Sequence, residues 1–175
     1  CHEIVQGDKT GDTPLSEQVK AYIKDKYNKP GEVFLGVTHR LDRPTTGVVL
    51  FARTSKALTR LNAMFQSHEQ IQKTYWAIVK NRPVEPEAEL VHYLVRNEQQ
   101  NKSYAYAAER AGAKRSVLSY RLLGSMDNYH LLEVALQTGR HHQIRCQLAK
   151  MGCPIKGDLK YGSPRSNPDG SICLH

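Results

Sequence analysis

Four runs of strand-forming residues, joined by short polar segments, constrain the fold of this 175-residue chain more than any other feature. The runs occupy residues 73–79, 90–95, 117–123 and 129–136. In the first run, the strand period places Tyr75, Ala77 and Val79 on one side, which fits a strand of a sheet. Because consecutive strands with short connections pair antiparallel, we expect a mostly antiparallel sheet.

Three other segments show the spacing of helices with one apolar face. The first has Thr13 as a candidate N-cap before Pro14, the second is capped by Thr54 or Ser55, and the third covers residues 140–151. Their inward positions are Leu15, Val19, Tyr22 and Ile23 in the first, Ala57, Leu58, Leu61, Met64 and Phe65 in the second, and Ile144, Leu148 and Met151 in the third.

Two further apolar runs, residues 33–37 and 48–52, are shorter strand candidates, and the second reads as buried. Because the helices do not alternate regularly with the strands, the order favours an α+β fold: a mixed, mostly antiparallel sheet with flanking helices. We see no internal repeat and expect one domain over residues 1–175. The chain begins at Cys1 rather than Met, and residues 171–175 begin another strand, so we expect truncation at both ends.

A single carboxylate stands among basic side chains in the segment His-Arg-Leu-Asp-Arg-Pro-Thr-Thr-Gly, residues 39–47. Positive charge on Arg40 and Arg43 favours the ionised form of Asp42, which suits a nucleophile or a base. The segment lies between two strand candidates, on a loop of the kind that often carries reactive groups. The alternative is a structural role, since Asp before a Gly-containing turn commonly stabilises the turn.

The net charge of +8 is concentrated in two segments. Residues 39–60 hold five Lys or Arg and one acid, and residues 137–165 hold six and one. Clustered positive charge indicates a polyanionic partner such as RNA, although a solvated basic face is the alternative for either cluster alone.

Cysteine and motif content argue against metals and cofactors. The four cysteines have no Cys-x-x-Cys spacing, which fits reduced thiols in a cytoplasmic protein. A metal site at His141, His142, Cys146 and Cys153 would have wider spacing than closed zinc sites, so we expect none. No Rossmann fingerprint or P-loop is present, and no apolar run approaches the ~20 residues of a membrane span.

Three motifs, in order, resemble those of the RluA-type pseudouridine synthases. The first is the His-Arg-Leu-Asp segment, with Thr45-Thr46-Gly47 where the family has Thr-Ser-Gly, a change that keeps a hydroxyl at the middle position. The second, Lys73-Thr74-Tyr75, is similar to the family's Lys-x-Tyr element, and the third, residues 138–145, is similar to Gly-Arg-x-His-Gln-x-Arg. With residues 154–162 included, the resemblance covers most of residues 37–162.

The resemblance implies isomerisation of uridine to pseudouridine in structured RNA, either ribosomal RNA, transfer RNA or both. Asp42 would be the catalytic carboxylate acting on a flipped-out uridine. Arg145 would pair with Asp42, and Tyr75 would pack against the target base. On the third predicted helix, His141 and Arg145 lie one turn apart and away from the apolar stripe, so we expect Arg145 to point into a cleft.

The same resemblance implies three RNA-binding residues. Arg40 would occupy the gap left by the flipped base, whereas Arg140 and His142 would position phosphates or shape their loop. No cofactor is implied, and we expect a monomer with RNA as its partner and no membrane association. Two alternatives remain: a non-catalytic RNA-binding or RNA-chaperone module, and a nucleoside glycosidase that uses one carboxylate and releases free uracil.

Overall fold

A computed structural model describes residues 11–67 and 70–175 of the chain. These residues divide into two compact units, 1–71 and 72–175. Helices and antiparallel sheets occur together, which confirms the α+β prediction.

The first unit consists of α1 (Leu15–Lys26), β1 (Gly36–Val37), β2 (Phe51–Ala52) and α2 (Ser55–Ser67). β1 and β2 pair antiparallel, with Gly36 opposite Ala52. The Cγ of Leu58 on α2 lies only 3.0 Å from where a Cβ of Gly36 would stand, so the missing side chain lets α2 approach β1 closely. The Oγ1 of Thr54 accepts a hydrogen bond from the Ala57 N–H and begins α2, as expected.

Several predictions for this unit are wrong in detail. The N-cap of α1 is Pro14 rather than Thr13, and it makes no capping bond through its side chain. Tyr22 is 58% exposed rather than inward. The strand candidates at 33–37 and 48–52 shrink to the two residues of β1 and the two residues of β2. In the second candidate, Val48 and Leu50 are exposed and belong to the loop between β1 and β2.

The second unit is built on a five-stranded sheet, ordered β3-β7-β6-β4-β5, in which all four pairings are antiparallel. Its strands are β3 (Lys73–Val79), β4 (Glu87–Asn97), β5 (Lys102–Tyr106), β6 (Lys114–Ser125) and β7 (His130–Leu136). Four of them match the predicted runs. The sequence missed β5, because its buried positions are Ser103 and Ala105, and small or polar residues give a weak hydrophobic signal.

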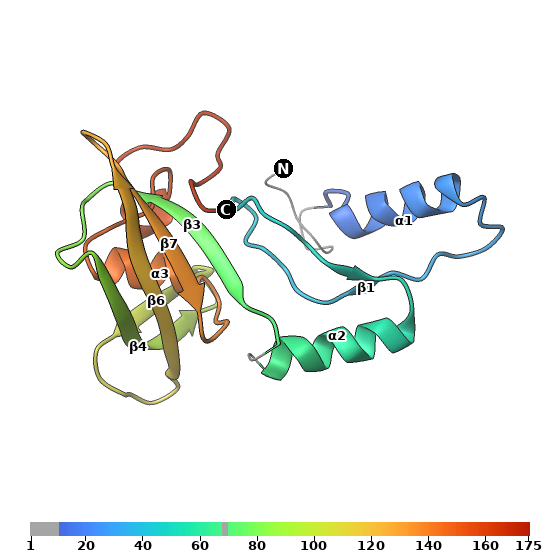
Figure 1. Ribbon diagram of the computed structural model, residues 1–175, viewed down its shortest axis with the longest axis horizontal. Coiled ribbons are helices and arrows are strands. Elements are labelled where there is room, and N and C mark those ends of the chain that lie inside the picture. Colours follow the sequence, from blue (N-terminus) through green and yellow to red (C-terminus); the bar gives the residue numbers. More distant parts are fainter. Residues whose placement is uncertain (1–10, 68–69) are drawn as a thin grey trace. The chain divides into compact units, whose positions relative to one another are not determined.

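Helix α3 (Gln143–Lys150) packs against one face of this sheet (Figure 1). Ile144 and Leu148, two residues of the predicted stripe, are 5% and 0% exposed and join the core around Val79, Leu118 and Val134. The helix begins three residues later than predicted, so His141 precedes it and does not share a helix face with Arg145. A short 3₁₀ helix, η1 (Leu159–Tyr161), follows α3.

The edge of β3 opposite β7 is covered by two later segments. The Trp76 N–H donates to the His175 carbonyl at 2.8 Å, and the Ile78 N–H donates to the Cys173 carbonyl at 2.9 Å. The Lys156 N–H donates to the Ile78 carbonyl at 2.8 Å. The strand expected to begin at 171 is not assigned; residues 171–175 instead reach β3 through an isolated antiparallel bridge between Leu174 and Ala77.

Candidate active site

Asp42 lies on the loop that connects β1 to β2 in the first unit. The loop is closed by two bonds at its base: the Oγ1 of Thr38 donates to the Leu50 carbonyl at 2.6 Å, and the Leu50 N–H donates to Nε2 of His39 at 3.1 Å. The Thr45 N–H donates to the Asp42 carbonyl at 2.9 Å, which forms a turn directly after the carboxylate. Asp42 thus lies on a loop with a defined backbone, the position that the sequence predicts, and its side chain is half-buried.

The other polar residues of this loop differ in exposure. Arg40 is exposed, and Arg43 forms an ion pair with Asp12. Thr45 is 3% exposed, and its Oγ1 has no hydrogen-bond partner within the described residues. The ring of His39 lies 4.8 Å from that of Phe65 on α2, which ties the start of the loop to the helix. Arg40 and Arg43 are thus both exposed to an external ligand, and Arg43 is in addition paired with Asp12.

Arg145 in the second unit is buried and held by a carboxylate. Its Nε donates to Oδ2 of Asp158 at 2.7 Å, and its Nη2 donates to Oδ1 at 2.9 Å. The two side chains are 5% and 1% exposed. Such a two-bond pair fixes the guanidinium plane. We expected Arg145 to point into a cleft instead of the core. Within the second unit its side chain is buried against Asp158, so that expectation is wrong for the part of the guanidinium that contacts Asp158.

Tyr161 connects Arg145 to the loop before α3. The Arg145 guanidinium carbon lies 5.1 Å from the centre of the Tyr161 ring. The Tyr161 hydroxyl accepts a hydrogen bond from the Ser103 N–H at 2.8 Å and lies 2.9 Å from Nδ1 of His142. Burial raises the pKa of Tyr161, so its hydroxyl stays protonated.

His142 is a structural residue of this loop. It is 8% exposed, and burial, helped by the positive charge of Arg145, lowers its pKa to about 2. The hydrogen bond between its Nδ1 and the Tyr161 hydroxyl holds the ring in place. The backbone of His142 is left-handed, with φ of 51°, and turns the chain into α3. These features fit loop shaping, one of the two roles expected of this histidine.

Gln143 holds the loop that carries Arg140. Its Oε1 accepts hydrogen bonds from the Thr138 hydroxyl at 2.8 Å and the Arg140 N–H at 2.9 Å, while its Nε2 donates to the Val117 carbonyl at 3.1 Å. Gln143 is itself 3% exposed, whereas Arg140 is exposed. The loop backbone is therefore anchored to β6 while the Arg140 side chain faces outward, as phosphate binding requires.

Lys73 and Tyr75 of the second motif lie at the beginning of β3. A Cβ at Gly139 would stand 3.2 Å from Nζ of Lys73, so the ammonium lies close to the loop that carries Arg140. Burial lowers the pKa of Lys73. Tyr75 is half-buried and packs against the core of the second unit, opposite Val134 of β7. This packing also fits the alternative reading of Tyr75 as a sheet residue.

The structure thus brings together Arg145, His142 and the loop of Arg140 around Tyr161. Asp42 and Arg40 belong to the first unit, so the pairing of Asp42 with Arg145 stays a prediction. Sequence reasoning missed Asp158, Tyr161, Ser103 and Gln143 as members of the site. The signal for the first two was present in residues 154–162, where Asp158 is the one acid of a basic segment.

Across 11–67 and 70–175, no group of three or more His, Cys, Asp or Glu is placed to hold a metal ion. Cys146 donates to the Ser103 carbonyl at 3.2 Å, and burial raises its pKa to about 11. In the same ranges no helix has the length and apolar character needed to cross a membrane.

The sequence matches a family model, RNA pseudouridylate synthase, over residues 3–150. An uncharacterized RNA pseudouridine synthase of Chloroflexus aurantiacus is 37% identical over 137 residues, covering 78% of this chain and 42% of that protein. The tRNA pseudouridine synthase C of Vibrio cholerae is 36% identical, covering 71% of this chain and 54% of that protein. The ribosomal large subunit pseudouridine synthase D of Zymomonas mobilis is 34% identical, covering 73% of this chain and 39% of that protein. The chain spans about half the length of these relatives, or less.

Solved structures show the same fold. Human RNA Pseudouridylate Synthase Domain Containing 4 superposes with a TM-score of 0.78 at 24% identity, covering 99% of this chain and 81% of that one. Human RNA Pseudouridylate Synthase Domain Containing 1 superposes with a TM-score of 0.72 at 21% identity, covering 99% of this chain and 75% of that one.

Proposed function

Because the chain belongs to the RNA pseudouridylate synthase family, we propose that it isomerises uridine to pseudouridine within RNA. The bond from N1 of uracil to C1′ of ribose breaks, the base turns, and C5 bonds to C1′. C5 then releases its proton while N1 gains one, so the atoms balance without a cofactor. The family match over residues 3–150, which includes the Asp42 segment, carries this proposal.

We assign the catalytic carboxylate to Asp42, acting on the flipped-out uridine as nucleophile or base. Its support is the closed loop that holds the residue half-buried beside the exposed Arg40. Arg145 has five guanidinium N–H donors, of which Asp158 takes two. We propose that Asp158 fixes the plane of the guanidinium and so orients Arg145 to serve Asp42.

The remaining residues are assigned to base and RNA contacts. Tyr75 would pack against the uracil, and Arg40 would fill the gap left by the flipped nucleotide. Arg140 would bind phosphate from its anchored loop, and His142 would keep that loop in shape. Relatives named for transfer RNA and for the ribosomal large subunit both occur, so we propose structured RNA of either class as substrate for a cytoplasmic monomer.

Asp42→Asn tests the assignment. The amide keeps the shape but removes the carboxylate, so turnover should fall at least about 10³-fold while RNA affinity is kept. The measurement is tritium release from RNA labelled at uridine C5, with Asp25→Asn, an exposed acid on α1, as the matched control.

Three outcomes separate the candidate functions. Wild-type release from Asp42→Asn would disprove the role of Asp42. RNA binding without any release by the parent protein would favour an RNA-binding module. Release of free uracil, measured by chromatography, would favour a glycosidase.

A further inference from the structure

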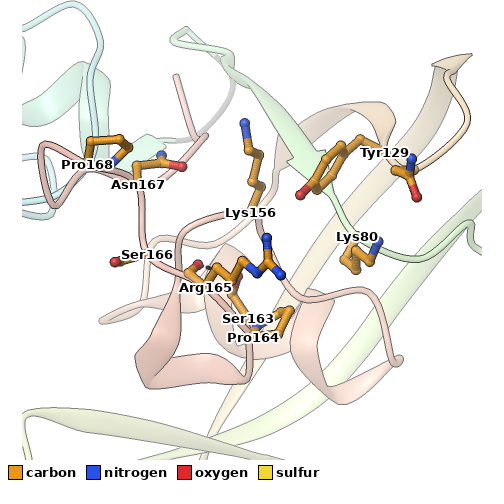
Figure 2. A pocket seen from close by; sticks show the side chains of 10 residues that line it. Lys80, Tyr129, Lys156, Ser163, Pro164, Arg165, Ser166, Asn167 and Pro168 are labelled. Carbon is orange, nitrogen blue, oxygen red and sulfur yellow. Dashed lines mark hydrogen bonds between the residues drawn. The ribbon is translucent and has the colours of Figure 1, made fainter.

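A basic pocket lies in the second unit at the end of β3 opposite Tyr75. It has a volume of about 580 Å³ and is formed by Lys80, Tyr129, Lys156 and the segment 163–168 (Figure 2). Lys80 directly follows β3, and Tyr129 directly precedes β7. From Tyr75 to Lys80 an extended strand covers ~17 Å, so the pocket is well separated from the residue proposed to contact the reacting base.

Positive charge dominates the pocket lining. Nζ of Lys80 and Nζ of Lys156 lie 5.2 and 5.1 Å from the centre of the same Tyr129 ring. Arg165 adds a third cation, and Figure 2 shows its side chain extending toward Tyr129 and Lys80. Of the described residues that line the pocket, none is acidic. Two ammonium groups lie close to one aromatic ring, and a third cation lines the same pocket. Like charges so close together repel one another, so a bound anion would stabilise them.

The loop that carries Arg165 is fixed from inside. Ser163 is 7% exposed; its N–H donates to the Asp158 carbonyl at 3.0 Å, and its hydroxyl donates to the Arg165 carbonyl at 3.0 Å. The Gly157 N–H donates to Oγ of Ser163 at 3.1 Å. These bonds order the loop before any ligand arrives, which lowers the entropic cost of binding.

The positive charge of the pocket has no role in the reaction proposed above. In the basic segment 137–165, Arg140 and Arg145 have roles at the candidate site, and Lys160 donates to the carbonyls of Gln100 and Asn101. Lys156 and Arg165 face the pocket instead. We propose that this pocket binds backbone phosphates of the substrate RNA at a distance from the reacting uridine. The identity of the ligand rests on the proposed function.

The test compares two double variants of the full-length protein. Lys156→Gln/Arg165→Gln removes two pocket cations, and Arg110→Gln/Lys114→Gln removes two exposed cations of the second unit that lie outside the basic segment 137–165. Binding of a fluorescein-labelled, unmodified tRNA transcript is followed by fluorescence anisotropy from 50 to 300 mM KCl. The pocket variant should bind about tenfold or more weakly, and its slope of log K against log[KCl] should be shallower by about 1 to 2. The control should stay within about twofold of the parent protein, because long-range charge is screened by salt.

Equal effects of the two double variants, or none from the pocket variant, would overturn the proposal. If the pocket variant loses its fold by circular dichroism, the single variant Arg165→Gln, at an exposed position, replaces it. Turnover on saturating RNA distinguishes this proposal from the proposed function. The pocket variant should raise KM and keep kcat, whereas a protein without synthase activity would still show the binding difference.

Discussion

At the residue scale, the ion pair of Arg145 and Asp158 is the most sensitive point of the second unit. Both side chains are nearly inaccessible, so loss of one charge leaves the other buried without compensation. Asp158→Asn should lower the free energy of unfolding by about 3–5 kcal/mol, measured by urea denaturation, with the exposed Asp25→Asn within about 0.5 kcal/mol of the parent.

A paired replacement separates stability from catalysis at this position. In Arg145→Met/Asp158→Leu, apolar side chains replace both charges, and such exchanges are often neutral or stabilising. We expect this variant to regain most of the lost stability but none of the isomerase activity. Restored activity would contradict the assignment of Arg145.

His142 makes stability depend on pH. Its pKa in the folded chain is far below 6.5, so below pH 6.5 the unfolded chain binds a proton that the folded chain does not. Its contribution is complete above pH 6.5, and unfolding free energy should fall by up to ~1.4 kcal/mol per pH unit below it.

The His142→Asn variant isolates this effect. Asparagine tolerates the left-handed backbone, where φ is 51°, and does not titrate. Urea denaturation from pH 7.5 to 5.5 should show a flatter profile for the variant. Burial also lowers the pKa of His92, which contributes in the same direction and remains in both proteins. Identical profiles would refute the role of His142.

At the scale of elements, Gly157 fixes the position of the segment between α3 and the last residues. Its φ is +90°, and a Cβ there would stand 2.7 Å from the Ser171 carbonyl oxygen. Gly162 has a similar φ of +98° with nothing within 4 Å of its Cβ position. Gly157→Ala should therefore cost backbone strain and a steric clash, and Gly162→Ala strain alone.

We expect Gly157→Ala to be less stable than Gly162→Ala by about 1–3 kcal/mol. Thermal denaturation of both variants measures the difference. Equal losses would show that the loop moves away from Ser171 without cost.

The prediction of helices and strands succeeded where the hydrophobic periodicity was strong. It failed where buried polar contacts or the presence of a pairing partner determine the structure. The runs that became β3, β6 and β7 alternate or carry β-branched residues, and the structure places them as expected. The prediction missed β5 because its buried residue Ser103 is polar. The Ser103 side chain is held in place by hydrogen bonds to His141, and such contacts leave no hydrophobic pattern in the sequence. Residues 48–50 look like a buried strand but lie in a loop, because apolar composition alone does not show which segment has a pairing partner.

At the scale of the whole molecule, the sequence predicted the α+β class, the strand core and the loop position of Asp42. Ordered motifs also identified the family, as the family match confirms. What it did not predict is the set of buried polar contacts around Tyr161. These depend on residues such as Ser103 and Asp158 that are far apart in the chain, and no local period encodes such pairs.

The covered edge of β3 has a consequence for solubility. A strand with unpaired N–H and C=O groups is a template on which a second chain can add, and β3 also exposes Trp76 by 55%. Residues 173–175 occupy those backbone groups from within the same chain. Because these groups are already bonded, another chain cannot pair with this edge of β3, and such pairing is the first step of edge-to-edge aggregation.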